Sequence, residues 1–290
     1  MNDDLQELSK IVGKAFRKAK RWYLAYLACQ FCVLVLAVIF IFVQMNPNTV
    51  AVTGFLAILA AECLRWNSDY WKSHGEWAKR MWEMVDGLGV RLDGKDVADW
   101  LAARPRGFLM DVTSDEMQGS EFDSHRAKGP VRVVENTRES AWWSKHESQR
   151  MVALLATVLA LVVLASFVAL ILSIASLSRA EAKQSGSLAQ NIGVIVCSVL
   201  GFVVSVNLMR LLADFHMFAS NAENIFRRCD RALESPSLEE CDALSIMHDY
   251  QVARNSAPLL PTFIWRLRRA HLREQWARLR PKVKARAPGR

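Results

Sequence analysis

The residues best suited to chemistry are a group of arginines near the C-terminus, flanked by two tryptophans. They are Arg266, Arg268, Arg269 and Arg273, with Trp265 and Trp276 on either side. Arg266, Arg269 and Arg273 share one face of a helix, because they are spaced i, i+3, i+7. A guanidinium fork matches phosphate geometry better than an ammonium group does, and an indole ring can stack on a base. The spacing therefore predicts a binding surface for a phosphate-bearing anion.

The positive charge of the chain is concentrated in the same tail. The formal net charge is +8, and the segment from Phe263 to Arg290 holds ten Lys or Arg against one acid, Glu274. The tail thus accounts for the whole net positive charge. Such a tail suits anionic lipid head groups or a polyanionic ligand, and both alternatives stay open. Arg104 and Arg106, from a loop in the middle of the chain, are added to the expected binding surface.

The sequence contains no recognisable catalytic or metal-binding constellation. The six His residues are scattered without H-x-x-x-H spacing, and no G-x-S-x-G, P-loop or H-E-x-x-H motif is present. Cys29 and Cys32 form a C-x-x-C, but it lies inside an apolar segment without a second ligand pair. We therefore expect a protein that is not an enzyme and has neither a metal site nor a cofactor.

Four apolar segments must position the arginines. No charged residue lies between Arg150 and Arg179, and an apolar, charge-free run longer than about 18 residues predicts a transmembrane helix. The expected spans are residues 22–44, 47–64, 151–177 and 188–209. The expected fold is all-α: a multi-pass membrane protein with four transmembrane helices, helical cytosolic extensions and a helical cytosolic domain.

The expected domain organisation follows from these spans. It comprises an amphipathic cytosolic helix (1–21), a transmembrane hairpin (22–64), a cytosolic segment (65–150), a second hairpin (151–209) and a helical C-terminal region with the basic tail (210–290). The second span is expected to continue as a helix to residue 86, the third to begin within a helix from residue 136, and the fourth to continue to Ser235. Lys and Arg gather in the N-terminal tail and avoid the two short turns, so the positive-inside rule places both termini in the cytosol.

Small and hydroxylated residues form a stripe on the fourth span. Asn191, Ser198, Gly201 and Ser205 fall within about 80° of one another at about 100° per residue. Such stripes mediate helix contacts in lipid or line a wetted pore, and these four are the candidate pore-lining residues. A conducting path forms more readily on an axis between subunits than inside one four-helix bundle, so we expect a homo-oligomer, with a tetramer as the working assembly.

Three short motifs carry a resemblance to a known family. They are the segment Arg254-x-x-x-Pro-Leu-Leu-Pro261 with the aromatic and basic helix after it, Asn136–Ser144 (NTRESAWWS), and Lys18–Tyr23 (KAKRWY). With its length and four spans, the chain resembles the bacterial four-transmembrane, SMODS-associated pore-forming effector family of nucleotide-based anti-phage defence systems. That family has an Asp after the second Pro, where this chain has Thr262.

The resemblance implies an anti-phage effector of the bacterial inner membrane. It implies a cytosolic site for a nucleotide-derived ligand, a cyclic or short single-stranded oligonucleotide, made by a cognate nucleotidyltransferase encoded nearby. The ligand would open the pore or hold it closed, and permeabilisation would arrest growth or kill the cell. The alternative is a non-conducting membrane-anchored scaffold, or membrane-disrupting module, whose basic tail binds anionic lipids.

Overall fold

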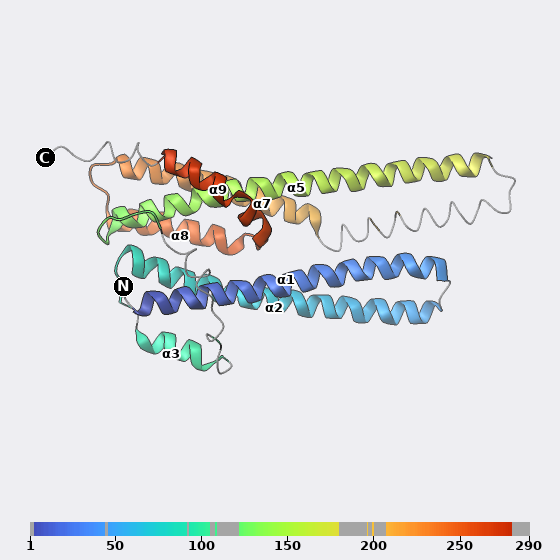
Figure 1. Ribbon diagram of the computed structural model, residues 1–290, viewed down its shortest axis with the longest axis horizontal. Helices are drawn as coiled ribbons and strands as arrows, with labels where there is room; N and C mark the ends of the chain where they lie inside the picture. The colour runs from blue at the N-terminus through green and yellow to red at the C-terminus, as the bar shows by residue number, and fades with distance from the viewer. Residues whose placement is uncertain are drawn as a thin grey trace. The chain divides into compact units, whose positions relative to one another are not determined.

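The computed structural model describes residues 3–43, 46–91, 93–104, 108, 122–179, 196, 199 and 207–279. Every regular element in these ranges is an α-helix and none is a strand, which confirms the predicted all-α class (Figure 1). The chain divides into two compact units. Unit 1 comprises Met1–Glu121 with Leu154–Ala213, and unit 2 comprises Phe122–Ala153 with Asp214–Arg290.

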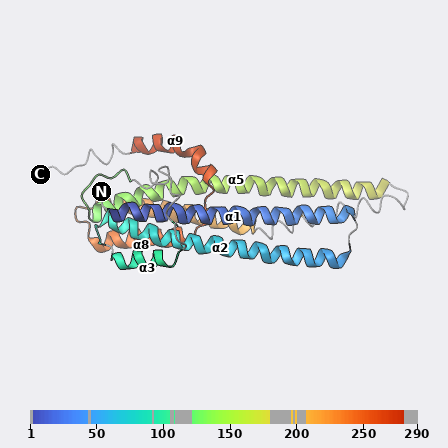
Figure 2. The same cartoon turned by 60° about the horizontal axis from the view of Figure 1, so that its bottom comes forward.

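Two long antiparallel helices form the frame of unit 1. Helix α1 spans Asp3–Val43 and α2 spans Pro47–Gly87, and the two lie side by side in both ribbon views (Figures 1 and 2). The predicted N-terminal helix and the start of the first predicted span thus belong to one continuous helix. Asn46 caps the start of α2, because its side chain accepts a hydrogen bond from the N–H of Asn48 at 2.9 Å.

Small side chains allow α1 and α2 to approach closely. The fully buried alanines of these helices are Ala15, Ala19, Ala61 and Ala78. Ser68 of α2 donates a hydrogen bond to the carbonyl of Ala19 at 3.0 Å. A Cβ added to Gly75 would lie 3.1 Å from the ring of Phe16, so a larger residue here would require this ring to shift. Close backbone approach through small residues is the usual packing mode of long apolar helices.

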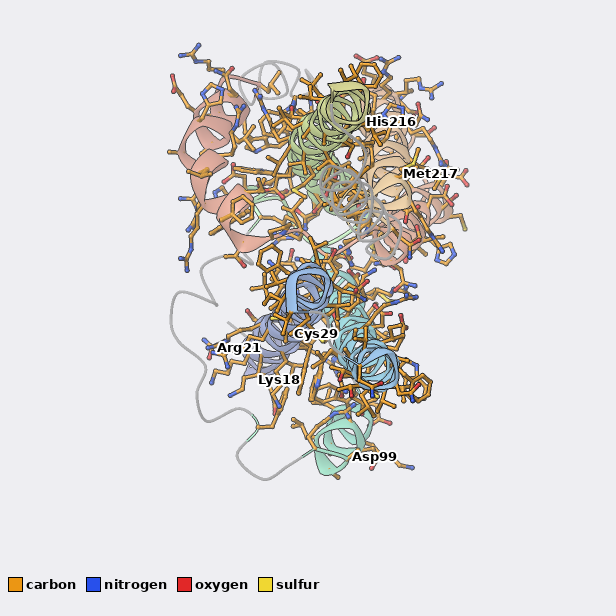
Figure 3. All side chains as sticks on the ribbon, turned by 90° about the vertical axis from the view of Figure 1, so that its right-hand side faces the viewer. Lys18, Arg21, Cys29, Asp99, His216 and Met217 are labelled. Carbon is orange, nitrogen blue, oxygen red and sulfur yellow. The ribbon has the colours of Figure 1, made fainter. Side chains whose placement is uncertain are left out.

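A short helix, α3 (Gly94–Ala102), packs against this hairpin. Its start is capped by Asp93, whose carboxylate accepts a hydrogen bond from the N–H of Lys95 at 3.0 Å. Val97 of α3 is buried in one cluster with residues of α1 and α2, Ile11 and Ala78. Figure 3 shows Asp99 on the outer side of α3.

Four helical segments build unit 2. They are the part of α5 (Pro130–Arg179) up to Ala153, the part of α7 (Leu208–Glu234) from Asp214, α8 (Glu240–Ser256) and α9 (Thr262–Leu279). The predicted helix that runs from residue 136 into the third apolar segment is confirmed, and the Pro258–Pro261 segment separates α8 from α9.

Polar contacts tie α5 to its neighbours in unit 2. Arg138 Nε bonds to Asp230 Oδ1 of α7 at 2.5 Å. The hydroxyls of Ser144 and of Tyr250, on α8, are 2.8 Å apart. Phe215 of α7 is almost completely buried in this unit. Part of the NTRESAWWS stretch is thus used to hold the helices of unit 2 together.

Two of the described helices, α2 and α5, are long and apolar enough to cross a membrane. Only 6% of the apolar stretch of α2 and 11% of that of α5 are buried by the rest of the chain. Leu161, Leu164 and Phe167 of α5 are exposed, so this apolar stretch of the helix is not buried as the core of the described bundle. The first predicted span, 22–44, lies in α1 up to Val43, whereas most of the fourth, 188–209, lies outside the described residues, and the number four stays a prediction.

The helix after the fourth predicted span begins later than we predicted. A continuous helix was expected to reach Ser235, but Asn207 adopts a left-handed conformation with φ 52°, and α7 starts at Leu208. The prediction is therefore wrong at this point, although the helix ends at Glu234 as expected. Asparagine is one of the few non-glycine residues that tolerate the left-handed region, because its short polar side chain bonds locally.

Candidate anion-binding pocket

A pocket of about 640 Å³ lies between α5 and α9, entirely within unit 2. Helix α5 contributes Trp142, His146, Gln149, Arg150 and Ala153, and α9 contributes Arg268, His271, Leu272, Gln275, Arg278 and Leu279. Both sets recur at intervals of three and four residues, so each forms one face of its helix. The volume falls within the range of about 300–1,000 Å³ that is typical of small-molecule sites.

An aromatic cluster holds α5 and α9 together beside the pocket. Trp142 of α5 is buried against Leu272 and Trp276 of α9, with the two indole rings 5.3 Å apart. Phe226 of α7 packs against the same cluster, which anchors it to the rest of unit 2. Because α9 runs antiparallel to α5, its first turns lie beside the end of this α5 segment, near Ala153.

The lining of the pocket is positively charged. Arg150, Arg268 and Arg278 contribute three guanidinium groups, and among the described residues no Asp or Glu belongs to the lining. Arg278 also bonds to Glu274 Oε1 at 2.5 Å on the outer side of α9, so its charge is partly balanced. Guanidinium groups form strong, often bidentate bonds with phosphate and carboxylate groups. The pocket is therefore suited to an anion, with phosphate as the best match.

His146 is the pocket residue whose protonation the surroundings control. Burial lowers the pKa of His146 below its ordinary value, and the positive charges of Lys145, Arg268 and Arg150 act in the same direction. Glu223 acts in the opposite direction. His146 is consequently neutral at neutral pH, and the ring edge can donate or accept a hydrogen bond. Its ring also lies 4.6 Å from that of Trp142, at a steep angle.

The arginines that the sequence singled out lie on different sides of α9. Arg268 lines the pocket. Arg266 and Arg273 are exposed on the opposite side, where helical spacing puts them with Arg269. The guanidinium of Arg269 stacks on the ring of Trp265, 4.4 Å from its centroid. The structure thus brings one of these four arginines into the pocket.

Arg104 belongs to unit 1, in a cluster of aromatic and basic side chains. Its guanidinium lies 4.5 Å from the ring centroid of Trp100 and 5.5 Å from that of Trp71. It also bonds to the hydroxyl of Tyr70. Lys18 of α1 lies 4.3 Å from the Trp71 centroid (Figure 3). These contacts give Arg104 a packing role between α2 and α3, and ligand binding by it stays a prediction.

The other residues predicted for the site fall outside the described residues. They are Arg106 and the candidate pore-lining residues Asn191, Ser198, Gly201 and Ser205.

Sequence reasoning missed the contribution of α5 to the pocket. Arg150 and His146 are spaced i, i+4 on the helix that precedes the third apolar segment, and this spacing was available in the sequence. His271 and Arg278 share the pocket face of α9. Only the packing of Trp142 against α9 brings these residues together, and no local pattern encodes a pairing between helices so far apart in the chain.

The comparisons with known proteins give no relative. No family model matches the chain, and neither the curated proteins nor the solved structures contain a match. The resemblance therefore stays an expectation based on short motifs. Thr262, which stands where the resembled family has an Asp, is the first residue of α9 and is exposed.

Proposed function

We propose that the chain is a multi-pass membrane protein whose cytosolic helical unit binds a phosphate-bearing ligand and thereby controls a pore. The ligand occupies the pocket between α5 and α9. In this proposal both termini are cytosolic, and the protein acts in the bacterial inner membrane as a homo-oligomer, a tetramer in the working scheme. It is not an enzyme and acts without a cofactor.

A single observation carries this proposal: the pocket and the apolar segment belong to one helix. Arg150 lines the pocket, and the charge-free run begins at the next residue, Met151. Helix α5 has 50 residues, which corresponds to about 75 Å at ~1.5 Å per residue. A ligand that pulls Arg150 toward Arg268 would therefore act directly on the membrane-crossing part of α5, without an intervening loop.

The chemistry of the pocket supports a short oligonucleotide as the ligand. Three arginines suit more than one phosphate group, and the amide side chains of Gln149 and Gln275 can bond to base edges. The resemblance adds the rest of the proposal: a cyclic or short single-stranded oligonucleotide from a cognate nucleotidyltransferase, and growth arrest or cell death during phage infection.

Binding of oligonucleotides by protein purified in detergent tests the ligand site. We expect a fluorescent short single-stranded or cyclic oligonucleotide to bind at low salt, and its affinity to fall as salt rises. Arg150→Gln with Arg268→Gln should weaken binding roughly 100-fold or more, because each lost charge-assisted hydrogen bond costs about 1.5–3 kcal/mol. The matched control, Arg266→Gln with Arg273→Gln, removes the same charge from the opposite face of α9 and should bind like the wild type.

Two results would contradict this assignment. Loss of binding in the control pair alone would move the site to the exposed face that the sequence predicted. Absence of binding to every oligonucleotide at low salt would remove the nucleotide from the proposal and favour the scaffold with a lipid-binding tail.

A further inference from the structure

The outward face of α9 combines large exposed apolar side chains with exposed arginines. Phe263 is 52% exposed and Leu267 is 77% exposed. They are spaced i, i+4, with the exposed Ala270 next in the same stripe. Arg266 and Arg273 are exposed on one flank of this stripe. Apolar side chains bordered by arginines suit contact between the first turns of α9 and the headgroup region of a membrane, because the apolar groups can insert between lipids while the guanidinium groups meet phosphates.

The position of this face within unit 2 also indicates contact with a membrane. Arg268 and Ala153 line one pocket, so the first turns of α9 lie beside the residues where the apolar run of α5 begins. Phe263 and Leu267 belong to these first turns, whereas the far end of α9 lies beside Trp142, farther from the apolar run. If α5 crosses the bilayer, the exposed stripe therefore lies at the depth of the lipid head groups.

We infer that the outward face of α9 docks on an anionic cytosolic leaflet, with Phe263 and Leu267 inserted between lipids and Arg266 and Arg273 at lipid phosphates. This inference rests on the proposed crossing of the bilayer by α5. It gives the two faces of α9 different partners: the inner face takes the ligand of the pocket, and the outer face takes the membrane. Arginine is attracted to anionic leaflets, and its long side chain reaches the phosphates while its stem stays among apolar groups.

Fluorescence quenching in vesicles tests the depth of α9 in the full chain. The six native cysteines are replaced by alanine, and one fluorophore is attached to Ala270→Cys, which leaves Phe263 and Leu267 unchanged. In vesicles of phosphatidylcholine and phosphatidylglycerol, nitroxide lipids should quench this label, and aqueous iodide should not. A label on Leu161→Cys reports insertion of α5. In a third variant the native Cys241, which is exposed at the start of α8, is kept and labelled. Its quenching by iodide and by nitroxide lipids serves as the reference for a position in solvent.

Paired variants then separate docking from misfolding. With Phe263→Ser and Leu267→Ser together, the label at position 270 should be quenched by iodide and by lipid to the same extent as the label at Cys241. The pair Met217→Ser (Met217 is labelled in Figure 3) with Val252→Ser removes two apolar side chains that are similarly exposed elsewhere in unit 2, and it should leave lipid quenching unchanged. In the wild type, lipid quenching of the label at position 270 should be stronger in vesicles with phosphatidylglycerol than in vesicles without it. Arg266→Gln with Arg273→Gln should abolish this difference in quenching.

The outcomes distinguish this inference from the proposed function. If the Leu161 label is quenched by lipid while the Ala270 label behaves like Cys241, α5 crosses the bilayer and docking of α9 is wrong. If the Leu161 label is also accessible to iodide, the membrane crossing fails and the inference falls with it. Equal effects of the two serine pairs would likewise overturn docking through Phe263 and Leu267.

Discussion

His146 sets the expected pH dependence of anion binding. Burial and the nearby cations lower its pKa, so the free pocket holds a neutral ring at neutral pH. A bound anion adds negative charge beside the ring, which favours the protonated imidazole and raises its pKa. Binding is therefore coupled to proton uptake, and the affinity should increase as the pH falls from neutral toward the lowered pKa of the free His146 ring.

The dependence of oligonucleotide affinity on pH measures this coupling. His146→Gln should reduce the slope of log Kd against pH on the acidic side, because one proton-binding group has been removed. His271 also lines the pocket and is kept in every variant. His216→Gln, an exposed position on α7 (Figure 3), serves as the control and should keep the wild-type slope. An unchanged slope in His146→Gln would contradict the assignment of His146 to the pocket.

The aromatic cluster of unit 1 explains how so short a helix as α3 is held. Isolated helices of fewer than about 12–15 residues are marginal in water, and α3 has nine. Trp100 stacks on Trp77 of α2, with centroids 5.8 Å apart, and donates a hydrogen bond to His74 Nδ1 at 3.2 Å. Burial and the charge of Arg104 lower the pKa of His74, so its ring stays neutral and accepts this bond at neutral pH.

Removing the Arg104 side chain should release α3. Arg104→Ala loses the cation–π contact with Trp100 and should destabilise the attachment of α3 by about 1–2 kcal/mol. Backbone amides of α3 should then exchange hydrogen roughly 5–30 times faster in the variant. Asp99→Ala, exposed on the same helix, is the control and should exchange like the wild type. Unchanged exchange in Arg104→Ala would show that Arg104 does not hold α3.

Most helices could be predicted because their signals are local. Asn46 and Pro47 indicate the start of α2, and the Pro258–Pro261 segment separates α8 from α9. The interruption at Asn207 has no such signal, since neither Gly nor Pro stands there and the apolar pattern continues through it. Helical spacing correctly placed Arg266 and Arg273 on one face of α9. It could not tell which face meets α5, because that depends on how Trp142 and Trp276 pack.

At the scale of the whole molecule, α5 joins the two kinds of surface that the proposed function needs. One part of the helix carries Arg150 and His146 into the pocket, and the part that follows exposes apolar side chains such as Leu161 and Phe167. Small changes at a binding site are transmitted efficiently along a rigid element, since packed helices shift as units. The central claim is that occupancy of the pocket changes the permeability of the membrane.

Ion flux from proteoliposomes tests this claim most directly. Vesicles holding the purified protein are loaded with an ion-sensitive dye, and the oligonucleotide that binds most tightly is added on the side of the cytosolic unit. We expect flux to change on addition in the wild type and in Arg266→Gln with Arg273→Gln, and to stay unchanged in Arg150→Gln with Arg268→Gln. If the wild type binds the oligonucleotide but its flux is the same with and without it, the pocket does not control a pore and the account is wrong.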